Sequence, residues 1–300
     1  NGTVTVGNTT LASPRLDIIA NGTGGRVVQT GDFISTATGT PGDIGLQVYG
    51  SGATYVLGAD IVSNTGVVIL DALEVSGGSR TIDTSGGNAA IQVTGGIDGI
   101  YAASGETTNS LTIAAGTGNV LLGQFAGFGN ANGTGEYIDN LTINAGFTNL
   151  YATEHQIAGT LSIPTGQLVL GGNVTAGAAI AITTTSDFDL TGNISLSAGT
   201  AITIAANIDG GYDLGLTSGA NTTLSGLVGA TARLSSLAIN ATGTTELNGG
   251  AINTTGGQTY TGSVMLGTAT VVNASVAGNV GFLGTVDGGY SLEVQTAGVT

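Results

Sequence analysis

The sequence predicts an all-β fold, a right-handed parallel β-helix (β-solenoid) with about 15 rungs of roughly 20 residues each. Three observations lead to this fold class. Short apolar segments alternate with period two, clusters of Gly, Asn, Ala or Thr separate them, and several segments recur along the chain. The segments between strands are too short for crossover helices, so a strand followed by a tight turn is the repeating rhythm.

Composition supports strands and turns over helices. The chain has 300 residues with 55 Gly, no Cys, no Trp and a net charge of -15. All four of its cations are Arg, namely Arg15, Arg26, Arg80 and Arg233. Strong helix formers are scarce, whereas Gly and Thr, which are poor in helix interiors, abound. A basic patch for nucleic acid is absent from this composition, and no apolar run reaches the ~20 residues that span a bilayer.

The first hundred residues are the least regular part. Short strands are expected over 16–19, 26–28 and 32–34, among two of the three Pro residues and three of the four Arg residues. We expect one continuous solenoid over 1–300. The alternative is a less regular portion over 1–104 and a regular repeat portion over 105–300.

From residue 105 onward the alternation is clear. Each three-residue unit has apolar outer residues and a small or polar middle residue, which is the pattern of a strand with one buried face. The units are 111–113, 141–143, 161–163, 168–170, 180–182, 188–190, 194–196, 202–204, 214–216, 264–266, 280–282 and 292–294. Both ends of the sequence read as the middle of a repeat, so we expect a piece of a longer protein or a filament subunit.

Several repeats resemble a known family. The segments 110–116, 140–146, 256–266 and 287–298 are similar to the haemagglutination-activity and β-strand-repeat passengers of large bacterial surface proteins, the filamentous-haemagglutinin-like adhesins. The resemblance covers about 105–300 well and the rest loosely. It implies export across the outer membrane, an extracellular or cell-surface location and an adhesive or fibrous role. The family's secretion domain is not recognisable here, so the export route stays open.

Few residues suggest chemistry. The single His155, next to Glu154, could do acid–base work, but a surface loop or turn position is the preferred interpretation. Asp187 and Asp189 lie two apart on an expected strand and share a face. Such carboxylate pairs serve glycoside hydrolysis or Ca²⁺ binding. No Arg or Lys lies between Arg80 and Arg233, so exposed solubilising carboxylates are preferred.

Three further patterns have ordinary explanations. Asp209–Asp213 and Asp287–Tyr290 share an Asp-Gly-Gly-Tyr motif that resembles Ca²⁺-binding Gly/Asp repeats. Those repeats need a nine-residue spacing, whereas these copies start at 209 and 287, so a turn with Tyr covering the edge is expected. The Gly-rich stretches 22–25 and 127–129 lack the lysine of a phosphate-binding loop. Thr-x-Thr units such as 3–5 are too scattered for an ice-binding face.

Asn-x-Ser/Thr is unusually frequent. It occurs eleven times, which favours glycosylation of an exported protein, although strand–turn alternation also generates it. The positions are Asn1, Asn8, Asn21, Asn132, Asn140, Asn173, Asn193, Asn221, Asn240, Asn253 and Asn273.

The expected function is therefore structural or adhesive, with no catalytic, cofactor-binding or metal-binding residues and Ca²⁺ as the sole candidate cofactor. The expected partners are other copies of the chain, adjoining segments of a longer chain, or cell-surface carbohydrate. Phe125, Phe128 and Phe147 are expected to cluster in loops or to stack inside. The alternatives are a β-helical polysaccharide lyase or hydrolase, and a self-assembling surface-layer or sheath subunit.

Overall fold

The computed structural model describes residues 3–12, 15–19, 25–36, 43–50, 52–64, 66–100, 109–125, 137–184, 186–276 and 278–298. The predicted fold class is confirmed: the chain is all-β, without a helix among these residues, and its parallel strands stack as a β-solenoid. The described part therefore contains no helix that is long and apolar enough to cross a membrane. Two compact units are present, unit 1 (Asn1–Gly159) and unit 2 (Thr160–Thr300).

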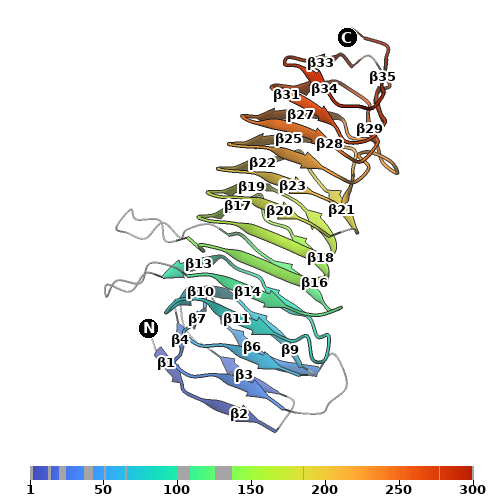
Figure 1. Cartoon of the computed structure of the whole chain (residues 1–300). Helices are drawn as coiled ribbons and strands as arrows, with labels where there is room; N and C mark the ends of the chain where they lie inside the picture. Colours follow the sequence, from blue (N-terminus) through green and yellow to red (C-terminus); the bar gives the residue numbers. More distant parts are fainter. Residues whose placement is uncertain are drawn as a thin grey trace. The chain divides into compact units, whose positions relative to one another are not determined.

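Unit 1 repeats a three-strand turn, and equivalent strands of successive turns pair in parallel (Figure 1). Three columns result, which we call faces. The first face contains β1 (Thr3–Val6), β4 (Arg26–Gln29), β7 (Thr54–Leu57), β10 (Ala72–Ser76) and β13 (Ile97–Ile100). The second contains β2 (Thr9–Leu11), β5 (Phe33–Ser35), β8 (Ile61–Ser63), β11 (Arg80–Asp83) and β14 (Leu111–Ala114). The third contains β3 (Leu16–Ile19), β6 (Asp43–Tyr49), β9 (Gly66–Leu70), β12 (Ile91–Val93) and β15 (Asn119–Leu122).

Two strands complete unit 1. The long strand β16 (Leu141–Leu150) pairs with β14 through its first half and with β15 through its second half, so it runs from the second face to the third. Strand β17 (Glu154–Ile157) follows it, and Gln156 N–H donates to the carbonyl of Phe125. Within unit 1, the strands before residue 105 and the strands after it therefore belong to the same columns, since β11 pairs with β14 and β12 pairs with β15.

Unit 2 has the same three-strand turn. It begins with β18 (Leu161–Leu170), which pairs with both β20 and β21. The first face contains β19 (Asn173–Ala176), β22 (Ile194–Ala198), β25 (Asp213–Ser218), β27 (Ser236–Ala241), β30 (Gln258–Tyr260) and β33 (Val280–Phe282). The second contains β20 (Ile180–Ile182), β23 (Ile202–Ile204), β26 (Thr222–Leu224), β28 (Thr244–Leu247), β31 (Ser263–Leu266) and β34 (Val286–Asp287). The third contains β21 (Asp187–Leu190), β24 (Asn207–Asp209), β29 (Ala251–Thr254), β32 (Thr270–Ala274) and β35 (Leu292–Thr296).

The core of each unit consists of side chains that stack in register from turn to turn. On the first face of unit 2 one such column is Val174, Leu196, Leu216, Ile239, Tyr260 and Phe282. The last two rings stack with centroids 4.9 Å apart. Period-two alternation sends these residues inward and their neighbours outward, as the sequence predicts.

Buried Gln–Tyr pairs recur in both units. Tyr55 donates its hydroxyl to Gln29 Oε1 in unit 1, and Tyr260 donates to Gln258 Oε1 in unit 2. The Gln258 amide in turn donates to backbone carbonyls, including that of Ile252. Burial raises the pKa of both tyrosine hydroxyls, which therefore stay protonated donors.

The turn count differs from the prediction. The solenoid has about 12 turns instead of about 15, because many turns exceed the assumed 20 residues. Side chains that bond to the adjacent turn in unit 1 reach residues 24, 29 or 31 positions away, whereas in unit 2 the separation falls to 20. Short apolar units reveal strands, but they do not reveal how much chain lies in each turn.

Candidate functional site

A recurring polar contact in the described residues ties adjacent turns together. Each of several outward Asn or Asp side chains accepts a hydrogen bond from a backbone N–H in the following turn. The acceptors are Asn8, Asp32, Asp60, Asn88, Asn173, Asn193, Asn207 and Asn221, with donor–acceptor distances from 2.8 to 3.3 Å. We call these residues the inter-turn clamps.

The inter-turn clamps account for much of the Asn-x-Ser/Thr excess. In Asn173-Val174-Thr175 the Asn is the clamp, the Val points into the core and the Thr points outward. The same alternation holds in Asn193-Ile194-Ser195. A clamp followed by a period-two strand therefore generates the motif, whether or not it carries a sugar. Asn1, Asn21 and Asn132 lie outside the described residues.

The other described Asn residues of this motif differ. Asn140 donates to Ser110 Oγ, Asn253 donates to the carbonyl of Val228, and Asn273 belongs to the row described below. Asn240 is exposed on β27, and its side chain makes no hydrogen bond to a described residue.

His155 does not lie in a surface loop, so that prediction is wrong. It sits on β17 with 1% of its surface exposed, because Glu154–Ile157 alternates outward and inward and places His155 and Ile157 in the core. Phe125 N–H approaches Nδ1 at 3.5 Å, and the two rings pack with centroids 5.7 Å apart. Burial lowers the pKa of His155 to about 4, against the opposing effect of the carbonyls of Ala152 and Leu150. This neutral imidazole is part of the core, away from the solvent that acid–base catalysis would need.

Asp187 and Asp189 share the outward side of β21, as expected, with Phe188 buried between them. Asp187 is exposed, and Asp189 accepts a hydrogen bond of 2.6 Å from Gln167. Asp189 pairs in register with Asp209 of β24. Beside Asp187 and Asp189 lie the Gln167 amide and a third carboxylate, Asp209, whereas a polysaccharide-cleaving site for an acidic substrate would need a cation.

Both Asp-Gly-Gly-Tyr segments form turns between strands. Gly210 and Gly288 have φ values of 134° and 128°, and a Cβ on either would lie within 2.7 Å of the carbonyl oxygen of Leu190 or Leu266. Asp209 is 7% exposed and accepts 2.9 Å hydrogen bonds from the N–H groups of both Thr231 and Ala232. The first copy therefore holds the loop of the next turn. No group of three His, Cys, Asp or Glu placed to hold a metal ion occurs in the described ranges.

The aromatic and Gly-rich predictions have mixed outcomes. Phe125 is fully buried and bridges to Ile97, and Phe147 is half-buried on β16. Phe128, the stretch 127–129 and most of 22–25 lie outside the described residues.

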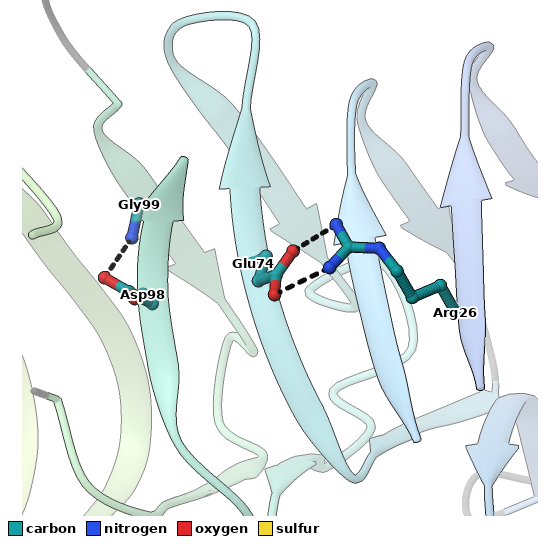
Figure 2. A network of polar contacts seen from close by, with 4 residues as sticks. All are labelled: Arg26, Glu74, Asp98 and Gly99. Atoms are coloured by element: carbon teal, nitrogen blue, oxygen red, sulfur yellow. Dashed lines mark hydrogen bonds and ion pairs between the residues drawn. The ribbon is translucent and has the colours of Figure 1, made fainter. Parts of the chain in front are cut away.

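A charged cluster on the first face of unit 1 escaped the sequence reading. Arg26 on β4 forms a bidentate ion pair with Glu74 on β10, across the intervening strand β7 (Figure 2). Glu74 pairs in register with Asp98 on β13, whose Oδ1 accepts a 2.8 Å hydrogen bond from Gly99 N–H. Both Glu74 oxygens are engaged by Arg26 and Asp98 is 3% exposed, so this cluster ties strands together.

A polar row on the third face of unit 2 is the second feature that the sequence did not reveal. Asn253, Asn273 and Gln295 lie in register on β29, β32 and β35. Arg233 donates to Asn273 Oδ1 at 3.3 Å, Asn273 donates to Gln295 Oε1 at 2.7 Å, and Gln295 donates to Glu293 Oε1 at 2.7 Å. We call Arg233, Asn273, Gln295 and Glu293 the amide row.

An open groove of about 470 Å³ adjoins the amide row. Its lining includes Asn273, Ser275, Gln295 and Thr296. Ser275 Oγ donates to the carbonyl of Thr254, which also accepts from Arg233. Amide and hydroxyl groups thus line this surface beside the apolar Ala274, Val294 and Ala297, and amides and hydroxyls hydrogen-bond hydroxyl-rich ligands.

Comparison with known proteins gave no match to a family model, to a curated protein or to a solved structure.

Proposed function

We propose that this chain is an extracellular structural or adhesive segment of a large bacterial surface protein, similar in role to the filamentous-haemagglutinin-like adhesins that its repeats resemble. The observation that carries the proposal is the turn-on-turn architecture itself. Parallel strand pairing, stacked core columns and inter-turn clamps repeat along both units. Such repetition builds an extended binding or spacing surface by adding turns, with each turn contacting its neighbours.

The character of the exposed side chains supports the proposal. On the first face of unit 2, four outward positions that lie in register are small and uncharged, namely Ser195, Gly215, Ala238 and Thr259. The amide row offers shallow hydrogen-bonding contacts to carbohydrate. A surface of this kind suits weak contacts spread over many turns.

A polysaccharide lyase or hydrolase is the competing function. A hydrolase needs one carboxyl group to donate a proton and a second to act as base or nucleophile across an open cleft. Glu74 is bound by Arg26, Asp98 is buried and Asp189 is bound by Gln167. These engagements favour the structural role over the enzymatic one.

Two measurements test the proposal. Fluorescently labelled chain should bind bacterial or host cell surfaces, and electron microscopy should show elongated particles, alone or joined into filaments or sheets. The same preparation should release no reducing ends from a panel of polysaccharides. Steady release of reducing ends, abolished by Asp187→Asn with Asp189→Asn, would replace the adhesive proposal with the enzymatic one.

A further inference from the structure

A patch of small, uncharged side chains lies on the first face of unit 2. Four strands carry it, β22, β25, β27 and β30, and each of them pairs with another strand on both sides. The patch therefore belongs to the interior of the sheet. Its outward residues form two columns in register, and none of them is buried. We call this set the flat patch, and its members are Ser195, Ser197, Gly215, Thr217, Ala238, Asn240 and Thr259.

The polar groups of the flat patch are available to solvent. Five of its side chains carry a hydroxyl or an amide, and none of the five forms a hydrogen bond to a described residue. They are Ser195, Ser197, Thr217, Asn240 and Thr259. Each of these groups can both donate and accept a hydrogen bond. Because the strands beneath them are paired on both sides, the flat patch presents these groups to water as a rigid array.

Charge is nearly absent from the strands that carry the flat patch. Asp213 alone is charged among the residues of β22, β25, β27 and β30. It begins β25 at the margin of the patch, and its Oδ1 accepts a 2.7 Å hydrogen bond from Ser236 Oγ. The other faces of unit 2 differ, since Glu246 and the exposed Met265 lie outward on the second face and Asp187 on the third. The flat patch therefore suits an uncharged ligand with a flat surface.

The spacing of the columns narrows the choice of ligand. Adjacent strands lie ~4.8 Å apart, and successive outward residues of one strand lie about 7 Å apart. Both repeats are close to the repeats of oxygen atoms in ice. A rigid ligand of matching period makes many weak contacts at once, each of which strengthens the others. Sugar polymers also present C–H surfaces that aromatic rings cover, and the flat patch contains no aromatic ring, whereas ice presents only water.

We propose that the flat patch binds ice, with its hydroxyl and amide groups taking the places of water molecules in the outermost ice layer. This activity goes beyond adhesion to cell surfaces and does not depend on it. The columns arise from register between strands, for example Ser197 with Thr217 and Thr217 with Asn240. Thr-x-Thr spacing along the chain does not reveal such columns, so the sequence gave no indication of this face.

Partition into slowly growing ice tests the inference on the whole chain. The chain should be enriched in the ice fraction relative to an inert protein of similar size in the same solution. Thr217→Tyr places a ring in the middle of the flat patch and should reduce this enrichment at least fivefold. Thr203→Tyr is the matched control, because Thr203 lies outward on the second face, in the middle of a strand paired on both sides, and should leave the enrichment unchanged. Urea midpoints of both variants establish that they are folded.

Each outcome bears on one proposal alone. Enrichment in ice no greater than that of the inert protein overturns ice binding, and equal losses in Thr217→Tyr and Thr203→Tyr overturn its location on the flat patch. Retention on crystalline cellulose, abolished by Thr217→Tyr and without enrichment in ice, would assign the flat patch to a polysaccharide surface instead. Binding to cell surfaces is measured separately, so the adhesive function stands or falls independently of these results.

Discussion

His155 places a neutral imidazole in the core of unit 1. Nδ1 faces the N–H of Phe125, and Nε2 is buried without a hydrogen-bond partner among the described residues. No ion pair with a described carboxylate compensates a charge on this ring. Protonation therefore costs far more in the folded state than in the unfolded one.

This environment predicts a pH dependence with a definite sign. The folded pKa of about 4 lies below the unfolded value of 6.5, so the neutral ring contributes stability above pH 6.5 that is lost as pH falls toward 4. Between pH 7.0 and pH 4.5 the loss should be about 2 kcal/mol. Urea unfolding at pH 7.0 and pH 4.5 measures it, with His155→Leu as the comparison. The wild type should lose more stability than the variant on acidification, and equal losses would contradict the prediction.

Inter-turn clamps show what a single polar residue does for a strand. Asn221 Oδ1 accepts from Thr244 N–H at 3.0 Å and so fixes the start of β28 against the turn before it. Asn240 has the same residue type and the same Asn-x-Thr context, but its side chain bonds to no described residue. Comparing Asn221 with Asn240 therefore separates the contribution of the inter-turn hydrogen bond to stability from the contribution of an Asn side chain as such.

Replacing these two residues should have unequal effects. Asn221→Ala should lower the free energy of unfolding by about 1 kcal/mol, because Thr244 N–H loses its acceptor. Asn240→Ala should change it by less than about 0.5 kcal/mol. Asn221→Asp keeps the acceptor oxygen but places a carboxylate beside Glu246, to which the Asn221 amide donates at 3.4 Å, so it should recover only part of the loss. Denaturant unfolding measures all three, and equal effects at the two sites would argue against the clamp.

A glycine column marks the end of the first face in unit 2. A Cβ on Gly199 would lie 2.0 Å from the carbonyl oxygen of Gly177, and one on Gly219 would lie 2.1 Å from that of Gly199. Backbone atoms fill this corner, so successive turns approach each other more closely than any side chain permits.

Gly199→Ala should therefore be costly. We expect a loss of about 1–3 kcal/mol, because the turn must shift away from its neighbour. Gly211→Ala is the control, since a Cβ there meets nothing within 4 Å and its φ is not positive. Thermal unfolding followed by circular dichroism compares the two variants. A melting temperature for Gly199→Ala equal to that of Gly211→Ala would show that the corner can relax.

At the scale of the molecule, a repeating turn implies that whole turns can be removed. Deletion of residues 194–213 removes β22, β23 and β24 and joins Asn193 to Leu214, which pairs in register with the deleted Ile194. The variant should fold cooperatively with reduced stability, since β25 can take the place of β22 against β19. Deletion of 194–204 removes two of the three strands of that turn and should not fold cooperatively. Urea unfolding distinguishes them, and similar behaviour of both variants would oppose the repeat interpretation.

Local sequence alone determined the strands with clear period-two alternation, together with their inward and outward sides. Period-two units such as Leu161–Ile163 and Ile202–Ile204 specify a face without reference to distant residues, because alternation is a property of the extended backbone. The Asp-Gly-Gly-Tyr turns were also predictable from local sequence, because Gly supplies the backbone conformation that a tight turn needs. Each depends on residues within about one turn of strand and loop.

Only the tertiary structure decided which residues meet across turns. The length of each turn, and hence the count of about 12, depends on loops that carry no periodic signal. Burial of His155 depends on Phe125, 30 positions away, and the bond from Arg233 to Asn273 spans 40. Stacking brings such residues together by register, and register results from the whole set of parallel pairings, so no local pattern in the sequence encodes it.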